Sequence, residues 1–194
     1  NHDACDKGRH IGVDVARSGA DNNVACLVED GVLTNFQHWQ SPDTMVTTEH
    51  IARLTREWRV DPGNLHVEQD GIGGAVVDRL RESGIMCDAV QSGGSQLGDW
   101  RDLTGDMHFS NRKAELSFAL RQGLIKGHLK IPRQFALFWK DLDRINMEPD
   151  IEKGIYKLEP KKRLRARTGS SPDFADALIV SMSRQGACPM IYWV

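Results

Sequence analysis

Acidic residues end two predicted strands and begin the last predicted helix of this sequence. Asp14 lies at the end of a short apolar strand, Glu68 ends a second, and Asp173 and Asp176 follow Ser171-Pro172 at a helix start. The histidines show no ligand pattern, and carboxylate oxygens alone favour Mg²⁺ or Mn²⁺. Two such ions can activate water and stabilise the leaving oxygen in phosphodiester hydrolysis. The pattern therefore predicts a divalent-metal site suited to cutting nucleic acid.

Each acidic residue also has a structural interpretation. Asp14 and Asp21 are both candidates for hydrogen-bonded turn residues, and the turn interpretation is stronger for Asp21. Asp70 competes with Glu68 as the carboxylate of the second strand. We favour Glu68, because a carboxylate at the end of an ordered strand, before a glycine turn, projects into the crevice where α/β proteins place ligands.

The helix pair also has a strong structural interpretation. An Asp in the first turn of a helix stabilises the helix dipole, which would explain Asp173 alone. Asp173 and Asp176 are three residues apart, however, so both carboxylates lie on one face. We expect Asp14 to lie between Glu68 and this pair, close enough to share metal with both.

The order of predicted elements indicates an α/β fold. Three strands with tight turns form an antiparallel meander, and strands and helices then alternate, so we expect a mixed sheet with helices on both faces. We assign 1–9 as a linker, 10–185 as one domain and 186–194 as a tail. The stretch 91–105 reads as a loop and 106–110 as an insertion. The predicted strands are 10–16, 24–28, 32–39, 65–68, 86–90 and 129–131, and the predicted helices begin near 44, 73, 111, 132 and 173.

Charge and cysteine content narrow the function classes. The net charge is −2, yet residues 153–167 contain seven basic residues and one acidic residue, which indicates either polyanion contact or a solvated loop. The four cysteines are far apart and show no zinc spacing, which favours a reducing cytoplasm. No GxxxxGK[ST] motif occurs, so a nucleotide-binding loop is not supported. No apolar run is long enough to span a bilayer.

Three motifs together resemble the C-terminal nuclease domain of tailed-bacteriophage large terminase subunits. They are Gly12-Val13-Asp14-Val15-Ala16 with Asp21, the stretch from Val67 to Leu80, and Ser171-Pro172-Asp173-Phe174-Ala175-Asp176-Ala177-Leu178. Asn111-Arg112-Lys113-Ala114-Glu115 is similar to a helix start of that family, although its basic order differs and leaves the role of Arg112 and Lys113 open.

The resemblance implies an RNase H-like fold and a metal-dependent endonuclease that cuts double-stranded viral DNA during genome packaging, at concatemer or headful ends. It implies a two-metal site with Mg²⁺ or Mn²⁺, catalytic Asp14, Glu68 and Asp173, and further ligands among Asp176, Asp21 and Asp70. The basic stretch becomes a DNA-facing β-hairpin. The DNA-binding residues implied are Lys157, Lys161, Lys162, Arg163, Arg165 and Arg167.

The resemblance also implies partners and a location: an N-terminal ATPase motor, the portal and the small terminase subunit, in the host cytoplasm and outside the mature virion. Other functions fit parts of the pattern. A Holliday-junction resolvase or another RNase H-like nuclease shares the acidic residues. A sugar-kinase or actin-like domain shares the first strand but needs a second lobe, and a DNA-binding or docking module leaves the carboxylates unexplained.

Overall fold

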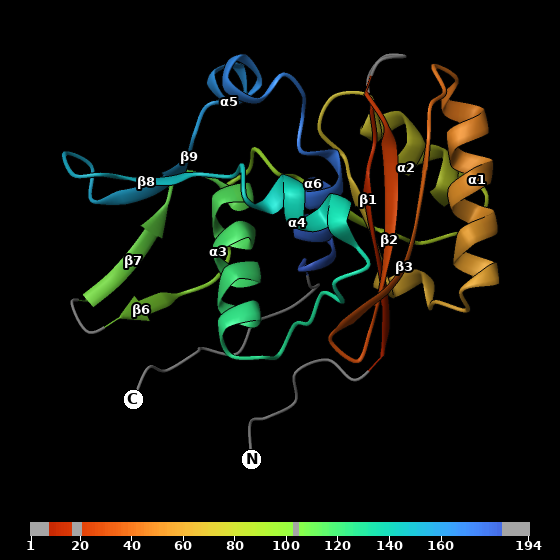
Figure 1. Cartoon of the computed structure of the whole chain (residues 1–194). Coiled ribbons are helices and arrows are strands. Elements are labelled where there is room, and N and C mark those ends of the chain that lie inside the picture. The colour runs from red at the N-terminus through yellow and green to blue at the C-terminus, as the bar shows by residue number, and fades with distance from the viewer. Residues whose placement is uncertain (1–7, 17–20, 103–104, 184–194) are drawn as a thin grey trace.

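A computed structural model describes residues 8–16, 21–102 and 105–183 (Figure 1). Its central sheet has five strands in the order β3-β2-β1-β4-β5. β1 (Arg9–Asp14), β2 (Asn23–Glu29) and β3 (Val32–Trp39) form the antiparallel meander, and β4 (Leu65–Glu68) and β5 (Asp88–Val90) run parallel to β1. The predicted mixed sheet is therefore confirmed. β1 begins at Arg9, one residue inside the predicted linker.

Helices cover both faces of this sheet, as Figure 1 shows. On one face lie α1 (Thr44–Glu57), which Asp43 caps, and α2 (Gly73–Glu82); a 3-10 turn, η1 (Pro62–Asn64), leads into β4. On the other lie α6 (Asp173–Ser181), α4 (Ala136–Leu142) and α3 (Arg112–Ile125). Each face has its own core, because successive side chains of a strand point to opposite sides. None of the described helices is long and apolar enough to cross a membrane.

A second, four-stranded sheet packs on α3 and differs from the sequence prediction. Its order is β6-β7-β9-β8, with β6 (Trp100–Asp102) inside the predicted loop and β7 (Gly105–Phe109) in the predicted insertion. Trp100, Phe109 and Phe118 form its core against α3. β6 and β7 are only three and five residues long, and the first lies in a Gly- and Ser-rich stretch, so the alternation of apolar residues is too short to predict strands.

The predicted basic hairpin is only partly correct. β8 (Met147–Asp150) and β9 (Ile155–Leu158) do form a hairpin. Most of the basic residues, however, lie on a helix, α5 (Lys161–Thr168), which Gly169 ends in the left-handed conformation. Arg and Lys have good helix propensity, and Pro160 before Lys161 suits a helix start. The 132–144 helix is also shorter than predicted, and Lys130 makes a single bridge to Val32 rather than a strand.

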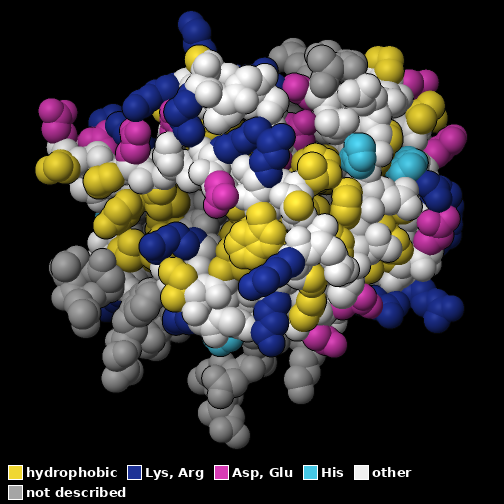
Figure 2. Space-filling model, in the orientation of Figure 1, with side chains coloured by type: hydrophobic (Ala, Val, Ile, Leu, Met, Phe, Trp, Pro, Cys, Tyr) yellow, Lys and Arg dark blue, Asp and Glu magenta, His cyan; other side chains and the backbone are white. Residues whose placement is uncertain are grey.

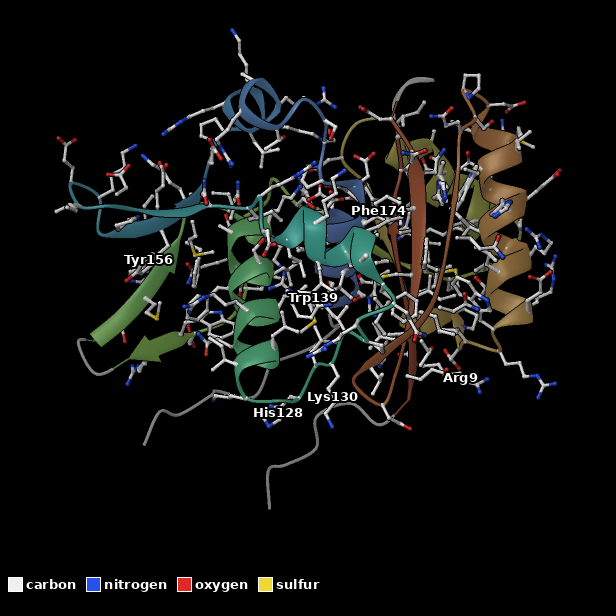
Figure 3. The ribbon with its side chains drawn as sticks, in the orientation of Figure 1. Arg9, His128, Lys130, Trp139, Tyr156 and Phe174 are labelled. Atoms are coloured by element: carbon white, nitrogen blue, oxygen red, sulfur yellow. The ribbon has the colours of Figure 1, made fainter. Side chains whose placement is uncertain are left out.

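An aromatic cluster fixes the start of α6 against α4 and the sheet. Phe174 stacks edge-on with Phe36 of β3 and with Phe138 of α4, at ring distances of 5.7 and 5.5 Å. Figure 3 labels Phe174 beside α4, with Trp139 further along the same helix. Because Phe174 is partly buried and packs against both elements, it holds the residue before it, Asp173, at the start of α6.

Gly12 determines how closely α6 approaches β1. A Cβ added at Gly12 would lie 2.1 Å from the carbonyl oxygen of Ala177 and 2.6 Å from Cβ of Ser181. The backbone of α6 therefore rests directly on the strand that carries Asp14, and no side chain fits between them.

We predict that Gly12→Ala lowers the free energy of unfolding by about 1–3 kcal/mol, the usual cost of overpacking, because α6 must move off β1. Urea unfolding followed by tryptophan fluorescence measures this. Gly74→Ala is the matched control, since its added Cβ would lie 3.4 Å from the carbonyl oxygen of Gln69, an ordinary contact. Equal midpoints for Gly12→Ala and wild type would contradict the packing argument.

Candidate metal centre

Two neighbouring parallel strands place the first two carboxylates side by side. Gly12 pairs with His66 and Val13 with Val67, so Asp14 and Glu68 follow at the same end of the sheet. Asp14 is buried, 7% exposed, on the face covered by α6. The glycine turn after Glu68 is tight, since a Cβ at Gly73 would collide with the carbonyl oxygen of Glu68. The carboxylate thus lies where the sequence prediction put it.

Asp14 and Glu68 interact as an acid and a carboxylate. Burial is the main cause that raises the pKa of Asp14 well above its usual value, and its hydrogen bond with Glu68 and the charge of Asp176 raise it further. Burial also raises the pKa of Glu68, but the hydrogen bond from Asp14 and the positive charge of Lys113 outweigh it and lower that pKa overall. These opposite shifts favour the proton of the pair on Asp14 rather than on Glu68.

The first turn of α6 brings the other two predicted carboxylates to the same place. Asp176 is 1% exposed, and its Oδ1 has no hydrogen-bond partner among the described residues. Asp176 interacts electrostatically with Asp14 and with Asp173, so it links the strand ends to the helix start. Asp14 thus interacts both with Glu68 of β4 and with Asp176 of the helix pair.

Asp173 and Asp21 form the outer part of the cluster. Oδ2 of Asp173 accepts a hydrogen bond from the backbone N–H of Asn22 at 3.1 Å. Burial raises the pKa of Asp173, and the charge of Asp21 adds to this. Asp21 also pairs with Arg165 of α5, which anchors that helix beside the carboxylates.

Asp70 has a different environment. Its Oδ2 accepts a hydrogen bond from the backbone N–H of Gly93 at 2.7 Å, which holds the loop after β5. It is not among the main groups that shift the pKa of Asp14, Glu68 or Asp173. Its role as a ligand stays a prediction, and the contact indicates a loop-fixing role.

The sequence prediction missed two residues of the centre. Lys113, in the first turn of α3, has its Nζ 2.7 Å from Oδ2 of Asp176. Asn111 caps that turn, and the backbone N–H of Lys113 donates to the carbonyl of Ser92. Ser92 is itself buried, and its hydroxyl helps to lower the pKa of Glu68. Lys113 lay in a recognised motif with no assigned role, whereas nothing in the sequence signals Ser92.

These residues fit a divalent cation in chemistry and charge. The donors are hard carboxylate oxygens, and a buried carboxylate oxygen without a partner, such as Oδ1 of Asp176, is costly unless a ligand satisfies it. Within residues 8–16, 21–102 and 105–183, however, no three acidic, histidine or cysteine side chains are arranged to hold a metal ion together. The ammonium of Lys113, with its charge close to Asp176, Glu68 and Asp14, stands among them instead.

Comparison with known proteins gives a fold but no sequence match. No family model matches the chain, and neither does any curated protein. The nuclease domain of the large terminase subunit gp2 of bacterial virus Sf6 superposes with a TM-score of 0.76 at 17% identity, over 94% of this chain and 89% of that one. The chain has the fold of the large-terminase nuclease domains. This RNase H-like architecture is the one that the sequence motifs predicted.

Two further solved structures share this terminase-nuclease fold. The large terminase nuclease from thermophilic phage G20c, with bound magnesium, has a TM-score of 0.60 at 15% identity, over 91% of this chain and 81% of that one. The nuclease domain from Thermus phage P74-26 has a TM-score of 0.59 at 14% identity, over 95% and 83%. Other structures of the Sf6 and G20c domains are described with manganese, calcium or cobalt.

We predict that Asp14→Asn makes the metal-free protein more stable than wild type, by a margin that grows as pH rises. The raised pKa means that the folded state keeps a proton which the unfolded chain loses near pH 3.8. The free energy of unfolding that the protonated Asp14 contributes is complete below pH 3.8, and it is lost as pH rises through the pKa of the folded state. Asn, always neutral, does not lose it. Urea unfolding at several pH values in EDTA tests this, and a constant difference between the two proteins would contradict it.

Proposed function

We propose that this chain is a divalent-metal-dependent DNA endonuclease that cuts double-stranded viral DNA during genome packaging. The observation that carries the proposal is the convergence of Asp14, Glu68 and the Asp173/Asp176 pair at one end of the sheet, with an unpartnered buried oxygen on Asp176. Stability alone does not account for so many buried carboxylates, because each is costly unless a cation is present. The likeness to terminase nuclease domains supports the same reading.

Asp14, Glu68, Asp173 and Asp176 would hold Mg²⁺ or Mn²⁺, and we propose two ions. When bound, the ions supply water activation and stabilisation of the leaving oxygen. The protein contributes the positions of the ligands. β1 and β4 fix Asp14 and Glu68, and Gly12 and Phe174 hold α6 against them. The hydrogen bond from Asp14 and the charge of Lys113 lower the pKa of Glu68 and so favour its ionised form.

The basic helix α5 lies over this end of the molecule and supplies the DNA contact. Figure 2 shows several Lys and Arg side chains in the upper part of the view, where Figure 1 places α5, with acidic side chains near them. Lys161 is close enough to lower the pKa of both Glu68 and Asp173, so α5 adjoins the carboxylates. Contacts of this kind are to phosphates and not to base edges, so binding is salt-dependent and weakly sequence-selective.

In this proposal the chain acts in the host cytoplasm within a packaging complex. The partners are an N-terminal ATPase motor of the full protein, the portal and the small terminase subunit, and the cut ends a headful or separates a concatemer. The cut needs no branched DNA, which distinguishes this enzyme from a Holliday-junction resolvase.

We predict that Asp14→Ala and Asp173→Ala each reduce Mg²⁺- or Mn²⁺-dependent plasmid cutting by more than about hundredfold, since loss of an outer-shell partner alone costs about 10–100-fold. Asp78→Ala, on the exposed side of α2, is the matched control. Circular dichroism shows whether each variant keeps its fold.

Full cutting by both folded variants would rule out the proposed site. Cutting of a four-way junction with no cutting of plasmid or linear duplex would instead identify a resolvase.

We predict that Lys162→Ala weakens duplex binding and reduces the slope of log K against log salt by about 0.9, because one phosphate contact is lost. Lys162 is exposed on α5 and makes no ion pair with any described residue. Fluorescence anisotropy with a labelled duplex, in calcium to limit cutting, measures this. Arg53→Ala on α1, across the sheet, should leave the slope unchanged, and equal slopes for Lys162→Ala and wild type would remove α5 from the interface.

A further inference from the structure

The ammonium of Lys113 lies in the middle of the proposed metal ligands. Its Nζ is 2.7 Å from Oδ2 of Asp176, and Glu68 and Asp14 are the next strongest charges acting on it. Burial disfavours the charged ammonium, but these three carboxylates outweigh burial and raise the pKa of Lys113. The 2.7 Å contact with Asp176 is therefore a salt bridge at the centre of the acidic cluster.

The position of this charge is fixed by the backbone and not by a flexible surface loop. α3 starts at Arg112, its cap Asn111 accepts a hydrogen bond from the N–H of Ala114, and the N–H of Lys113 donates to the carbonyl of Ser92. Glu115, one turn along, is tied to Trp100 and to Arg112. The lysine is thus held at the cluster from two sides, by the loop after β5 and by α3.

Charge is the property that a metal ion and this ammonium share. A single positive group between carboxylates offsets their repulsion, and a divalent ion in the same place would do so more strongly. The Lys113 ammonium and a divalent ion cannot both bind beside Asp176 and Glu68, because the two positive charges would repel each other at contact distance. The lysine and an ion on this side of the cluster must therefore exclude each other.

We infer that, in the metal-free protein, the Lys113 ammonium fills one of the cation positions of the cluster, and that a divalent ion binding at Asp176 displaces it. This rests on the proposed metal-dependent function. Lys113 is then a positioning residue that sets how much metal is needed to load the site.

The structure also provides a place for the displaced side chain. A cavity of about 240 Å³ adjoins Lys113 and Asp176, between the start of α3, the end of β9 and α5. It is lined by Asn111, Asn146 and Glu159, whose oxygens can accept from an ammonium. The Lys113 side chain is 24% exposed, and its four-carbon stem has the rotations needed to reach this space.

The test is Mn²⁺ binding by calorimetry on the full chain, with wild type, Lys113→Met and Lys113→Arg. Lys113→Met should bind Mn²⁺ about 10–100-fold more tightly, the factor that a hydrogen-bonded charge pair represents. Lys113→Arg keeps the charge and should bind no more tightly than wild type. Lys140→Met, exposed on α4 and not among the groups that shift the pKa of Asp14, Glu68 or Asp173, should not show the gain.

Thermal unfolding gives a second readout that needs no catalysis. Lys113→Met should have a lower Tm than wild type in EDTA, since the carboxylates lose their countercharge, and a larger rise in Tm on adding Mn²⁺. If Lys113→Met does not fold without metal, Lys113→Gln, which keeps a donor toward Asp176, replaces it in both measurements.

The two proposals fail in different ways. Wild type that binds Mn²⁺, with Lys113→Met (or its Gln replacement) binding equally or more weakly, overturns the inference and leaves the proposed function intact. If neither wild type nor any variant binds Mn²⁺ or Mg²⁺, the proposed function fails and the inference falls with it.

Discussion

The contact between α6 and β1 at Gly12 is the constraint on which the rest of the structure depends. The strand presents Gly12 and Asp14 on the same face, two residues apart, and the helix backbone rests on the glycine. That close approach brings the first turn of α6, with Asp173 and Asp176, to the end of the strand. Any larger residue at position 12 would separate the helix carboxylates from Asp14, so one missing side chain sets the geometry of the whole cluster.

Gathering these carboxylates has an electrostatic cost, and the structure offsets it in three ways. A proton stays on Asp14, as its raised pKa shows. Lys113 places a positive charge beside Asp176 and Glu68. Arg165 pairs with Asp21 at the outer edge. In the proposed metal site a divalent cation would displace both the proton and the ammonium, because carboxylate ligands bind metal in their deprotonated form.

The sequence alone was enough to predict the meander, the parallel strands and the position of the four central carboxylates, because each of these has a local signal. A carboxylate ending an apolar strand and two acidic residues three apart at a helix start are such signals. The second sheet was missed because β6 and β7 are short and owe their stability to packing on α3. Ser92 was missed for a related reason: the loop after β5 brings its carbonyl to the N–H of Lys113 at the start of α3, a long-range contact that no local pattern shows.

The basic stretch illustrates how tertiary structure changes the meaning of a charge run. Read along the chain it is a block of cations, yet in the fold most of its arginines already have acidic partners. Arg163 and Arg167 pair with Glu159, and Arg165 with Asp21. In the proposed complex a DNA phosphate must therefore compete with these carboxylates for the arginines, whereas Lys162 is exposed and makes no ion pair with any described residue. If α5 contacts DNA as proposed, its net attraction for phosphates is smaller than its formal charge indicates. The pairing of Arg165 with Asp21 holds α5 beside the carboxylates.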